Sequence, residues 1–290
     1  MKRFIAMLGI LCILLCSCAM PSQIADIATT TLPVYQFTTA LCNGTDLTVT
    51  RLVTESVSCL HDYSLNVSQV KAVEKASVVV LSGAGLEDFM ADILSDSRII
   101  DASTGITLLE SCHDHDHETE HGHSHDSDAH IWLSPANAMI MAENICHGLC
   151  EQYPQYSEIF LANLQVLQQQ ILQLQSYGQA QLSDLSCRDM ITFHDGFSYL
   201  AQAFDLHILA AVEEESGAET SAKELIELIA MACEHNIPAI FTETNGSVSA
   251  AQIISAEIGI PIYTLDMAMS GDDYFQAMYH NIDCIREALS

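Results

Sequence analysis

The sequence predicts an α/β protein with two lobes, each built on a mostly parallel four-stranded sheet flanked by helices, and one long helix that joins them. Short β-rich runs alternate with helical stretches from about residue 46 onward. The same alternation returns in the second half of the chain, after one long amphipathic segment. Strands that alternate with helices form parallel sheets with helices on their faces. A chain of 290 residues is long enough for two domains that each bury a core.

The N-terminus has the features of an export signal. Met1-Lys2-Arg3 precedes an apolar run from Phe4 to Leu15, which is too short to span a bilayer but suits a signal sequence. The run ends in Leu15-Cys16-Ser17-Cys18, which resembles a bacterial lipoprotein box. We therefore expect residues 1–17 to be removed and Cys18 to carry a lipid that anchors the protein to a membrane outside the cytoplasm. An ordinary secretory signal with an incidental cysteine is the alternative, and it predicts the same compartment.

The first half of the mature chain contains the elements of one lobe. Strands are expected at residues 47–50, 77–81 and 98–101, and helices at 68–75, 87–94 and 135–150. Ser134 and Pro135 open the last of these helices as an N-cap and a first-turn proline. We assign residues 46–153 to an N-terminal lobe and residues 18–45 to a lipid-anchored segment that precedes it.

A long helix is expected at residues 154–182, followed by a second lobe at residues 183–290. Apolar residues recur there at spacings of three and four, at Phe160, Leu164, Leu167, Ile171 and Leu174. This period is that of an amphipathic helix. In the second lobe, strands are expected at residues 190–193, 207–210, 239–242 and 262–265, with a helix at 222–234.

The charge balance limits the possible partners. The chain has 9 Lys and Arg against 38 Asp and Glu, and a formal charge of -29. A surface this negative argues against nucleic acid and anionic lipid, and it favours cations as ligands. The alternative is that the charge only keeps an exported protein soluble. The cysteines that follow the signal region permit disulfides, but their pairing cannot be read from the sequence.

Side chains that can bind metal follow several of the predicted strands. His194 follows strand 190–193, Glu243 follows 239–242 and Asp266 follows 262–265. In the first half, His61 lies in a loop after a strand candidate, and His130 comes just before the helix that starts at Pro135. Ligands bind beyond the carboxyl ends of strands in open α/β sheets, so these residues are candidates for one cleft. A single histidine at a strand end is more often structural, but several together are less easily explained that way.

Five motifs, in order along the chain, resemble those of a known family. They are Leu60-His61-Asp62-Tyr63 with the segment 76–87, Asp128 to Pro135, Thr192 to Leu200, Phe241-Thr242-Glu243, and Leu265-Asp266. Together they cover nearly the whole mature chain. On these motifs the chain resembles the zinc and manganese solute-binding lipoproteins of bacterial ABC importers.

The resemblance implies a metal site and the role of each matched residue. His61, His130 and His194 would be metal ligands, and Asp266 would complete the set. Leu60 departs from the family, which usually has proline before the first histidine. Glu243 is interpreted as a partner that orients a ligating imidazole.

The predicted ligand set favours zinc over manganese. Three imidazoles and one carboxylate suit four-coordinate Zn(II), whereas Mn(II) prefers more oxygen ligands. Manganese members of the family tend to have glutamate at the position of His194. Zn(II) is therefore the expected transported ligand, and Mn(II) remains possible.

A histidine-rich loop is expected at residues 113–128. Its composition of His, Asp, Glu, Ser, Thr and Gly cannot pack into a core. The imidazoles are those of His113, His115, His117, His121, His123 and His125. We interpret the loop as an auxiliary site that gathers zinc or senses its supply, outside the primary site. A solvated acidic loop without metal is the alternative.

The function implied by the resemblance is capture of Zn(II) outside the cytoplasm and delivery to an ABC permease. The protein would then be a monomer and not an enzyme. One alternative is a zinc-dependent hydrolase, because three histidines with an open position can activate water. Asp266 argues against it, since a fourth protein ligand closes the site. Another alternative is an adhesin or a zinc buffer with the same site, which the sequence does not separate from transport.

Overall fold

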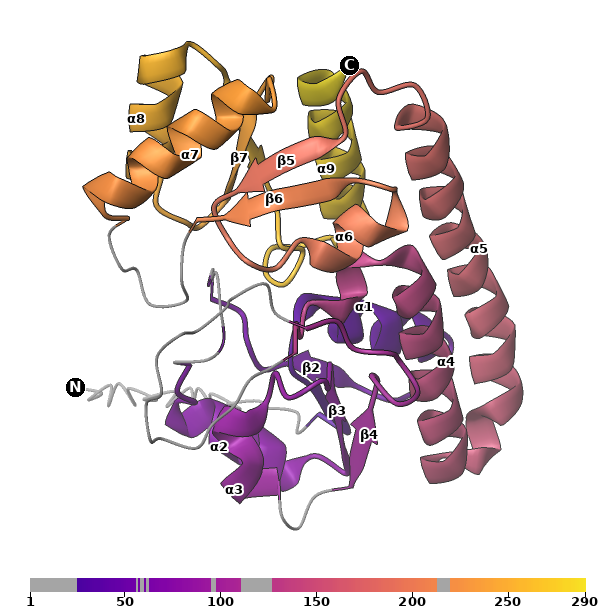
Figure 1. Ribbon diagram of the computed structural model, residues 1–290. Helices are drawn as coiled ribbons and strands as arrows, with labels where there is room; N and C mark the ends of the chain where they lie inside the picture. The colour runs from indigo at the N-terminus through magenta and orange to yellow at the C-terminus, as the bar shows by residue number, and fades with distance from the viewer. Residues whose placement is uncertain are drawn as a thin grey trace, which may run out of the picture.

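The computed structural model describes residues 25–55, 57, 60, 63–94, 98–110, 127–212 and 220–290. Two α/β lobes lie one above the other, and one long helix runs along the side of both (Figure 1). This is the predicted architecture. Of the described helices, none combines the length and the apolar character needed to cross a bilayer. The expected signal peptide and Cys18 lie outside the described residues.

The N-terminal lobe is built on a parallel sheet in the order β2-β1-β3-β4. Its strands are β1 (Ile27–Thr29), β2 (Val49–Arg51), β3 (Val78–Leu81) and β4 (Ile99–Asp101). The helices α1 (Leu32–Leu41) and α4 (Pro135–Gln152) pack with α5 on one face of the sheet. The other face is covered by α2 (Val67–Lys75), the 3₁₀ helix η1 (Asp88–Met90) and α3 (Ala91–Leu94).

This lobe begins earlier than the expected boundary at residue 46. β1 lies between β2 and β3, so the segment assigned to residues 18–45 contains a central strand of the sheet and the helix α1. Strand β1 has only three residues, Ile-Ala-Thr, which is too short to show a pattern of its own. The sequence signal for α1 is Pro33 in its first turn, which sequence reasoning did not use.

The C-terminal lobe is built on a second parallel sheet, in the order β6-β5-β7-β8. Its strands are β5 (Asp189–Thr192), β6 (His207–Ala211), β7 (Ile240–Glu243) and β8 (Ile262–Leu265). Helices α7 (Ala222–Glu234) and α8 (Ser249–Ile258) pack on one face. Helices α6 (Ser198–Ala203) and α9 (Tyr274–Leu289) pack on the side that joins the main core.

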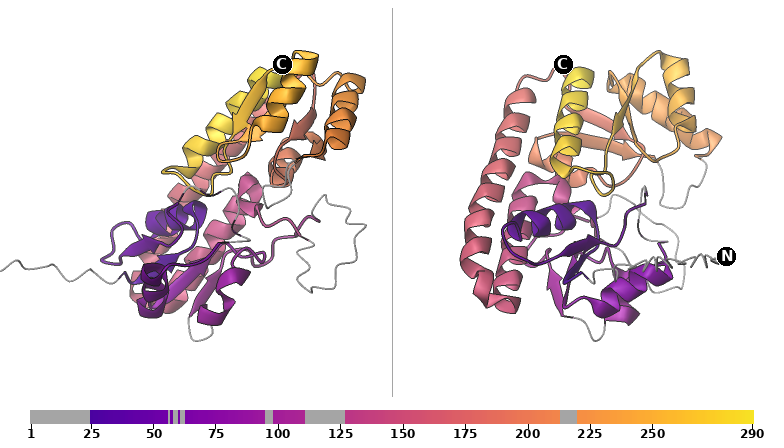
Figure 2. Two further views of the ribbon diagram at one scale, coloured as in Figure 1. Left: turned by 90° about the vertical axis from the view of Figure 1, so that its left-hand side faces the viewer. Right: turned by 180° about the vertical axis from the view of Figure 1, so that it is seen from behind.

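The long helix α5 (Ser157–Gln181) follows the 3₁₀ helix η3 (Pro154–Tyr156) and has 25 residues. All five apolar residues predicted to line one face are buried: Phe160, Leu164, Leu167, Ile171 and Leu174. The helix runs beside α4 in one lobe and α9 in the other (Figures 1 and 2). The main hydrophobic core contains side chains from both sheets, so the two lobes share one continuous core.

Several predicted element boundaries shift by one to three residues in the structure, and one predicted helix is broken. The helix expected at residues 87–94 is interrupted, with η1 followed by the short α3. Strand β7 ends at Glu243 itself rather than at the residue before it. Strand ends are hard to place from sequence because they depend on pairing across the sheet, here of Glu243 with Leu265.

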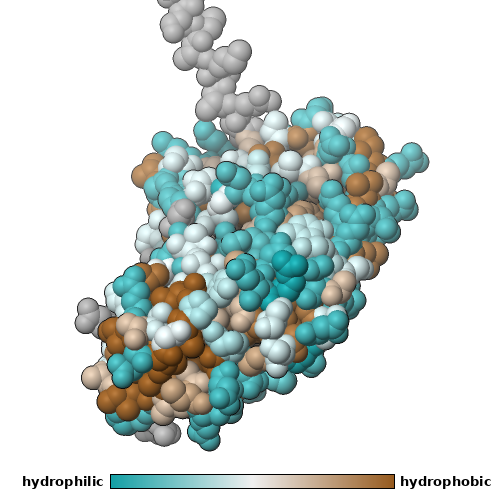
Figure 3. All heavy atoms as spheres, turned by 90° about the horizontal axis from the view of Figure 1, so that it is seen from above, coloured by the Kyte–Doolittle hydropathy of each residue, from teal (hydrophilic) through white to brown (hydrophobic). Residues whose placement is uncertain are grey.

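The face seen from above in Figure 3 carries a concentration of apolar side chains. It lies over α7 and α8, where Ile226 is 67% exposed and Ile253 is 52% exposed. Val248, just before α8, adds to it.

Candidate metal site

His130 and His194 come from different lobes and meet at their junction. His130 precedes the 3₁₀ helix η2 (Ile131–Leu133), and His194 lies just beyond the carboxyl end of β5. Their ring centroids are 5.3 Å apart, with the rings at 83° to each other. Both side chains are buried. The structure therefore brings together two of the predicted ligands, which are 64 positions apart by number in the chain (130 and 194).

Asp128 lies beside one nitrogen of the His130 ring and leaves the other nitrogen available to a ligand. The Nδ1 atom of His130 lies 2.8 Å from Oδ1 of Asp128. A carboxylate oxygen accepts hydrogen bonds, so Nδ1 carries the proton and Nε2 keeps its lone pair. Nε2 is buried and has no hydrogen-bond partner among the described residues. An orphaned buried nitrogen is costly, and a metal ion would satisfy it.

Glu243 lies beside His194 in a similar way. Its Oε2 atom is 3.8 Å from Nδ1 of His194, and both side chains are almost fully buried. That distance is longer than a hydrogen bond, so the two groups are close neighbours in a space from which water is excluded. Gly246 packs tightly against Glu243, since a Cβ there would lie 2.6 Å from Cγ of Glu243.

Gly196 allows the two histidines to come close. A Cβ at this position would lie 2.7 Å from Cδ2 of His194, 2.9 Å from Nδ1 of His130 and 2.6 Å from Cε of Met267. All three distances are shorter than those real Cβ atoms make, so a side chain at residue 196 would displace these groups. Sequence reasoning assigned no role to Gly196 or Asp128, although both stand in the motifs it singled out. Their proximity in sequence to His194 and His130 was the available signal.

Asp266 is held in place immediately after β8. Its backbone N–H donates to Oδ1 of Asn281, and Nδ2 of Asn281 donates to its carbonyl, both at 2.7 Å. Its Oδ1 accepts a 2.7 Å hydrogen bond from the backbone N–H of Ala268, which has a φ of 53°. The next residue, Met267, is the one whose Cε meets Gly196 between the two histidines. Asp266 is therefore adjacent in sequence to a residue that contacts the pair.

The remaining predicted ligands are outside the described residues. These are His61, the six histidines of residues 113–125 and, as a lipid attachment site, Cys18. Within the described ranges, no three His, Cys, Asp or Glu side chains form a group that could hold a metal. The ligand set of His61, His130, His194 and Asp266 thus stays a prediction that the described geometry supports in part.

Other described histidines lie away from this junction. His207 and His235 flank Asp189 at the opposite end of β5 from His194, with Nδ1 distances of 3.2 Å and 3.6 Å to its carboxylate. His280 on α9 contacts Cys284 one turn further along. These side chains are more exposed than His130 and His194, and they serve as internal controls for the site.

Comparison with known proteins now decides the family. The model of the family ZnuA, described as "Zinc-uptake complex component A periplasmic", matches residues 27–288. The chain belongs to this family. The predicted resemblance is confirmed, and so is the expectation that the protein belongs to an extracytoplasmic class.

Several relatives match over most of the chain. A putative metal-binding protein of Treponema pallidum is 29% identical over 295 residues, covering 95% of this chain and 92% of the relative. The zinc-binding protein AdcA of Streptococcus pyogenes is 29% identical over 285 residues, covering 90% of this chain but 55% of AdcA. The chain thus spans about half the length of these streptococcal relatives.

The fold agrees with that of a solved member of the family. A crystal structure of ZnuA is 30% identical and superposes with a TM-score of 0.78, over 92% of this chain and 100% of that chain. The predicted fold class is confirmed.

Proposed function

We propose that this protein captures Zn(II) outside the cytoplasm and delivers it to an ABC permease. The observation that carries the proposal is the buried pair of His130 and His194, one from each lobe. Each histidine has a carboxylate beside its Nδ1 atom. The chain belongs to a zinc-uptake family, and its relative AdcA is named as a zinc-binding protein. Both facts point to the same cargo.

The proposed ligands are His61, His130, His194 and Asp266. Nε2 is the atom of His130 that would bind the metal. Nδ1 is bonded to Asp128, and Nε2 has no hydrogen-bond partner among the described residues. Imidazole nitrogens with a carboxylate behind them are oriented and more basic, which strengthens a bond to zinc. A set with three imidazoles and one carboxylate favours Zn(II), and Mn(II) is the second candidate.

Capture and release follow from the position of the site between two lobes. Ligands from both lobes converge on the ion, so binding favours the closed arrangement. Release requires some of these ligands to separate. The long helix α5 and the core shared by both sheets keep the relative movement of the lobes small.

We propose no catalytic activity. A fourth protein ligand at Asp266 leaves no open position for a metal-bound water, which a zinc hydrolase needs. The chain does contain one HExxH pattern, at residues 117–121. In zinc proteases this motif lies on a helix, with both histidines on one face. Here it belongs to the histidine-rich segment, outside the described residues, and we assign that segment to metal gathering.

The remaining parts of the proposal concern attachment and partners. We propose a lipid anchor at Cys18, a monomeric state and a permease as the partner that accepts the zinc. Because the chain covers about half of the streptococcal relatives, their further activities are not transferred to it. An adhesin or a zinc buffer with the same site is the competing function.

Metal analysis tests the cargo. The protein is purified without added metal, its metal content is measured, and zinc and manganese then compete for the metal-free protein. We expect one tight zinc site per chain that outcompetes manganese. A preference for manganese would overturn the assignment of the cargo. A variant lacking residues 113–125 should keep the tight site and lose only the weaker binding.

Growth of a deletion strain separates transport from adhesion or buffering. A strain that lacks the gene should grow poorly when zinc is scarce, and the intact gene should restore growth. Restoration by a His130→Ala and His194→Ala double variant would contradict the proposed role. Unimpaired growth of the deletion strain would favour the adhesin or buffer.

A further inference from the structure

The loop that begins at Asp266 is hydrogen-bonded to the opposite lobe at five of its residues, 267, 269, 271, 273 and 274. It consists of residues 266–274, which we name the strap, and it connects β8 to α9 in the C-terminal lobe. The carbonyls of every second residue, 267, 269 and 271, accept hydrogen bonds from the N-terminal lobe. The donors are Trp132 Nε1 to Met267 at 2.8 Å, Leu32 N to Met269 at 3.0 Å, and Arg51 Nη1 to Gly271 at 2.7 Å.

The end of the strap is fastened by Gln36, which caps a helix of the other lobe. Its Nε2 donates to Oδ1 of Asp273 at 3.3 Å, and its Oε1 accepts from the backbone N–H of Tyr274 at 2.7 Å. Asp273 is the N-cap of α9, whereas Gln36 lies on α1. The first turn of α9 is therefore capped in part by the N-terminal lobe. The loop reaches down to α1, as Figures 1 and 2 show.

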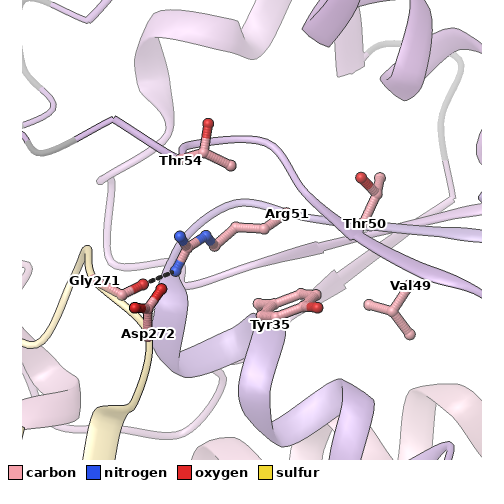
Figure 4. A pocket seen from close by; sticks show the side chains of 7 residues that line it. All are labelled: Tyr35, Val49, Thr50, Arg51, Thr54, Gly271 and Asp272. Carbon is pink, nitrogen blue, oxygen red and sulfur yellow. Dashed lines mark hydrogen bonds between the residues drawn. The ribbon is translucent and has the colours of Figure 1, made fainter.

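Arg51 makes its contact at the rim of a pocket between the lobes. Its side chain extends from the end of β2, over the ring of Tyr35, to the strap, and it bonds there to the carbonyl of Gly271 (Figure 4). The pocket has a volume of about 330 Å³ and is lined by both lobes, with Asp272 on the strap side. The chain has only 9 Lys and Arg, and this guanidinium donates to a backbone carbonyl of the strap.

Aromatic packing buries part of the strap, namely residues 267–270 and Tyr274, whereas Gly271 and Asp272 are exposed. Tyr274 is fully buried, its hydroxyl donates to the carbonyl of Trp132 at 2.8 Å, and its ring meets that of Phe37 edge to face at 5.1 Å. Trp132 is also fully buried, and its ring lies 5.4 Å from that of His130. The residue that holds the strap therefore also contacts a proposed ligand.

We infer that residues 266–274 form an inter-lobe strap, and that Arg51 and Gln36 are positioning residues that act through it on Asp266. The inference deepens the proposed function and rests on Asp266 being a ligand. Movement of the lobes apart at this end must break the strap's hydrogen bonds, so the strap holds Asp266 at a fixed distance from His130. Without the strap, the ion would be held by ligands on two lobes that separate more readily.

Substitution of Arg51 tests the inference, with Arg98 as the matched control. Arg98 also lies in the N-terminal lobe and donates one hydrogen bond, to Gln152 at 2.8 Å, within that lobe. Arg51→Gln should weaken zinc binding by about tenfold, a factor that corresponds to about 1.4 kcal/mol. Arg98→Gln makes the same change of charge and should leave the zinc affinity unchanged. Equal affinities of the two variants would overturn the positioning role.

A second pair of variants repeats the test without changing charge. Gln36→Ala removes both contacts with the start of α9, and Gln168→Ala removes a single bond to Glu143 between α4 and α5. Gln36→Ala should raise the zinc dissociation constant and the rate of zinc dissociation. Gln168→Ala should change neither. Urea unfolding of each variant measures its free energy of unfolding, and so shows whether a lower zinc affinity results only from lower stability.

Two measurements on the metal-free protein test the strap apart from the proposed function. Trp132 is the one tryptophan of the chain, so its emission reports the strap directly. In Arg51→Gln, this emission should shift to the red, and the amide of Leu32 should exchange its hydrogen several-fold faster. No change in either would refute the strap. If Arg51→Gln shows both changes but the wild-type protein binds no zinc, the strap stands and only the proposed function is refuted.

Discussion

Asp128 accepts two hydrogen bonds from His130 through a single carboxylate oxygen. The backbone N–H and the ring Nδ1 of His130 both lie 2.8 Å from Oδ1 of Asp128. The carboxylate therefore sets the position of the residue and the tautomer of its ring together. Partners of this kind typically contribute a factor of about 10–100 in metal affinity.

The first prediction concerns this pair. Asp128→Asn should lower the zinc affinity by about 10–100-fold, because an amide orients the ring but no longer makes it more basic. Competition with a chelator of known affinity measures the change. Asp101→Asn is the control, since Oδ1 of Asp101 accepts two bonds from Ser103 in the same pattern at the end of β4. An effect of equal size in the control would remove the special role of Asp128.

The second prediction concerns the close approach at Gly196. Gly196→Ala should displace the rings of His130 and His194 and the side chain of Met267, because a Cβ there lies within 2.9 Å of all three. Zinc affinity should fall in the folded protein. Gly148→Ala meets Ile100 at a similar distance of 2.6 Å but lies on α4, away from the histidines. That variant should lose stability and keep its zinc affinity, as titration and thermal unfolding together would show.

The third prediction concerns metal selectivity. His194→Glu replaces an imidazole with oxygen ligands, which manganese prefers and zinc does not require. The ratio of zinc to manganese affinity should fall, as measured by competition titration of the two ions. The side chain of Glu243 beside this position adds a second carboxylate, so the variant should also bind cations less tightly at low pH. An unchanged ratio would mean that residue 194 does not contact the ion.

The fourth prediction concerns Glu87, whose carboxyl is buried under the ends of β1 and β3. Thr30 Oγ1 and the backbone N–H groups of Ser82 and Gly83 donate to it. Burial raises the pKa of Glu87 from 4.5 to about 7, and these hydrogen bonds oppose the rise. The folded protein thus binds this proton more tightly than the unfolded chain. The protonated Glu87 carboxyl therefore contributes fully to the free energy of unfolding below pH 4.5. This contribution is lost as the pH rises through 7.

The loss amounts to on the order of 3 kcal/mol, because each pKa unit corresponds to about 1.36 kcal/mol. Glu87→Gln cannot ionise and should remove this part of the pH dependence. Urea unfolding of wild type and variant at about pH 4.5 and pH 8 measures it. The exposed Glu74 on α2 supplies the control variant Glu74→Gln. Parallel pH profiles for wild type and Glu87→Gln would show that Glu87 does not titrate in this range.

Much of the fold could be predicted because its pattern is local. The period of α5 and the alternation of β3, β6 and β8 with helices depend on short stretches of sequence. The strand β1 was missed because three residues carry no period, and its place between β2 and β3 is set by pairing with distant strands.

The site could be predicted only as separate residues. His130, His194 and Asp266 were found from strand ends and motifs, but sequence spacing does not show that Gly196 lets two rings approach. The roles of Asp128 and Asn281 depend on contacts made in three dimensions. The strap depends on bonds between positions 32 and 269, or 51 and 271, which no local pattern encodes.

The most direct test of the account is zinc titration of two double variants. His130→Ala with His194→Ala removes the pair that meets at the lobe junction, whereas His207→Ala with His235→Ala removes two histidines at the opposite end of β5. The first variant should lose the tight zinc site, and the second should keep it with wild-type affinity. Tight zinc binding that survives in the first variant would contradict the site proposed between the lobes.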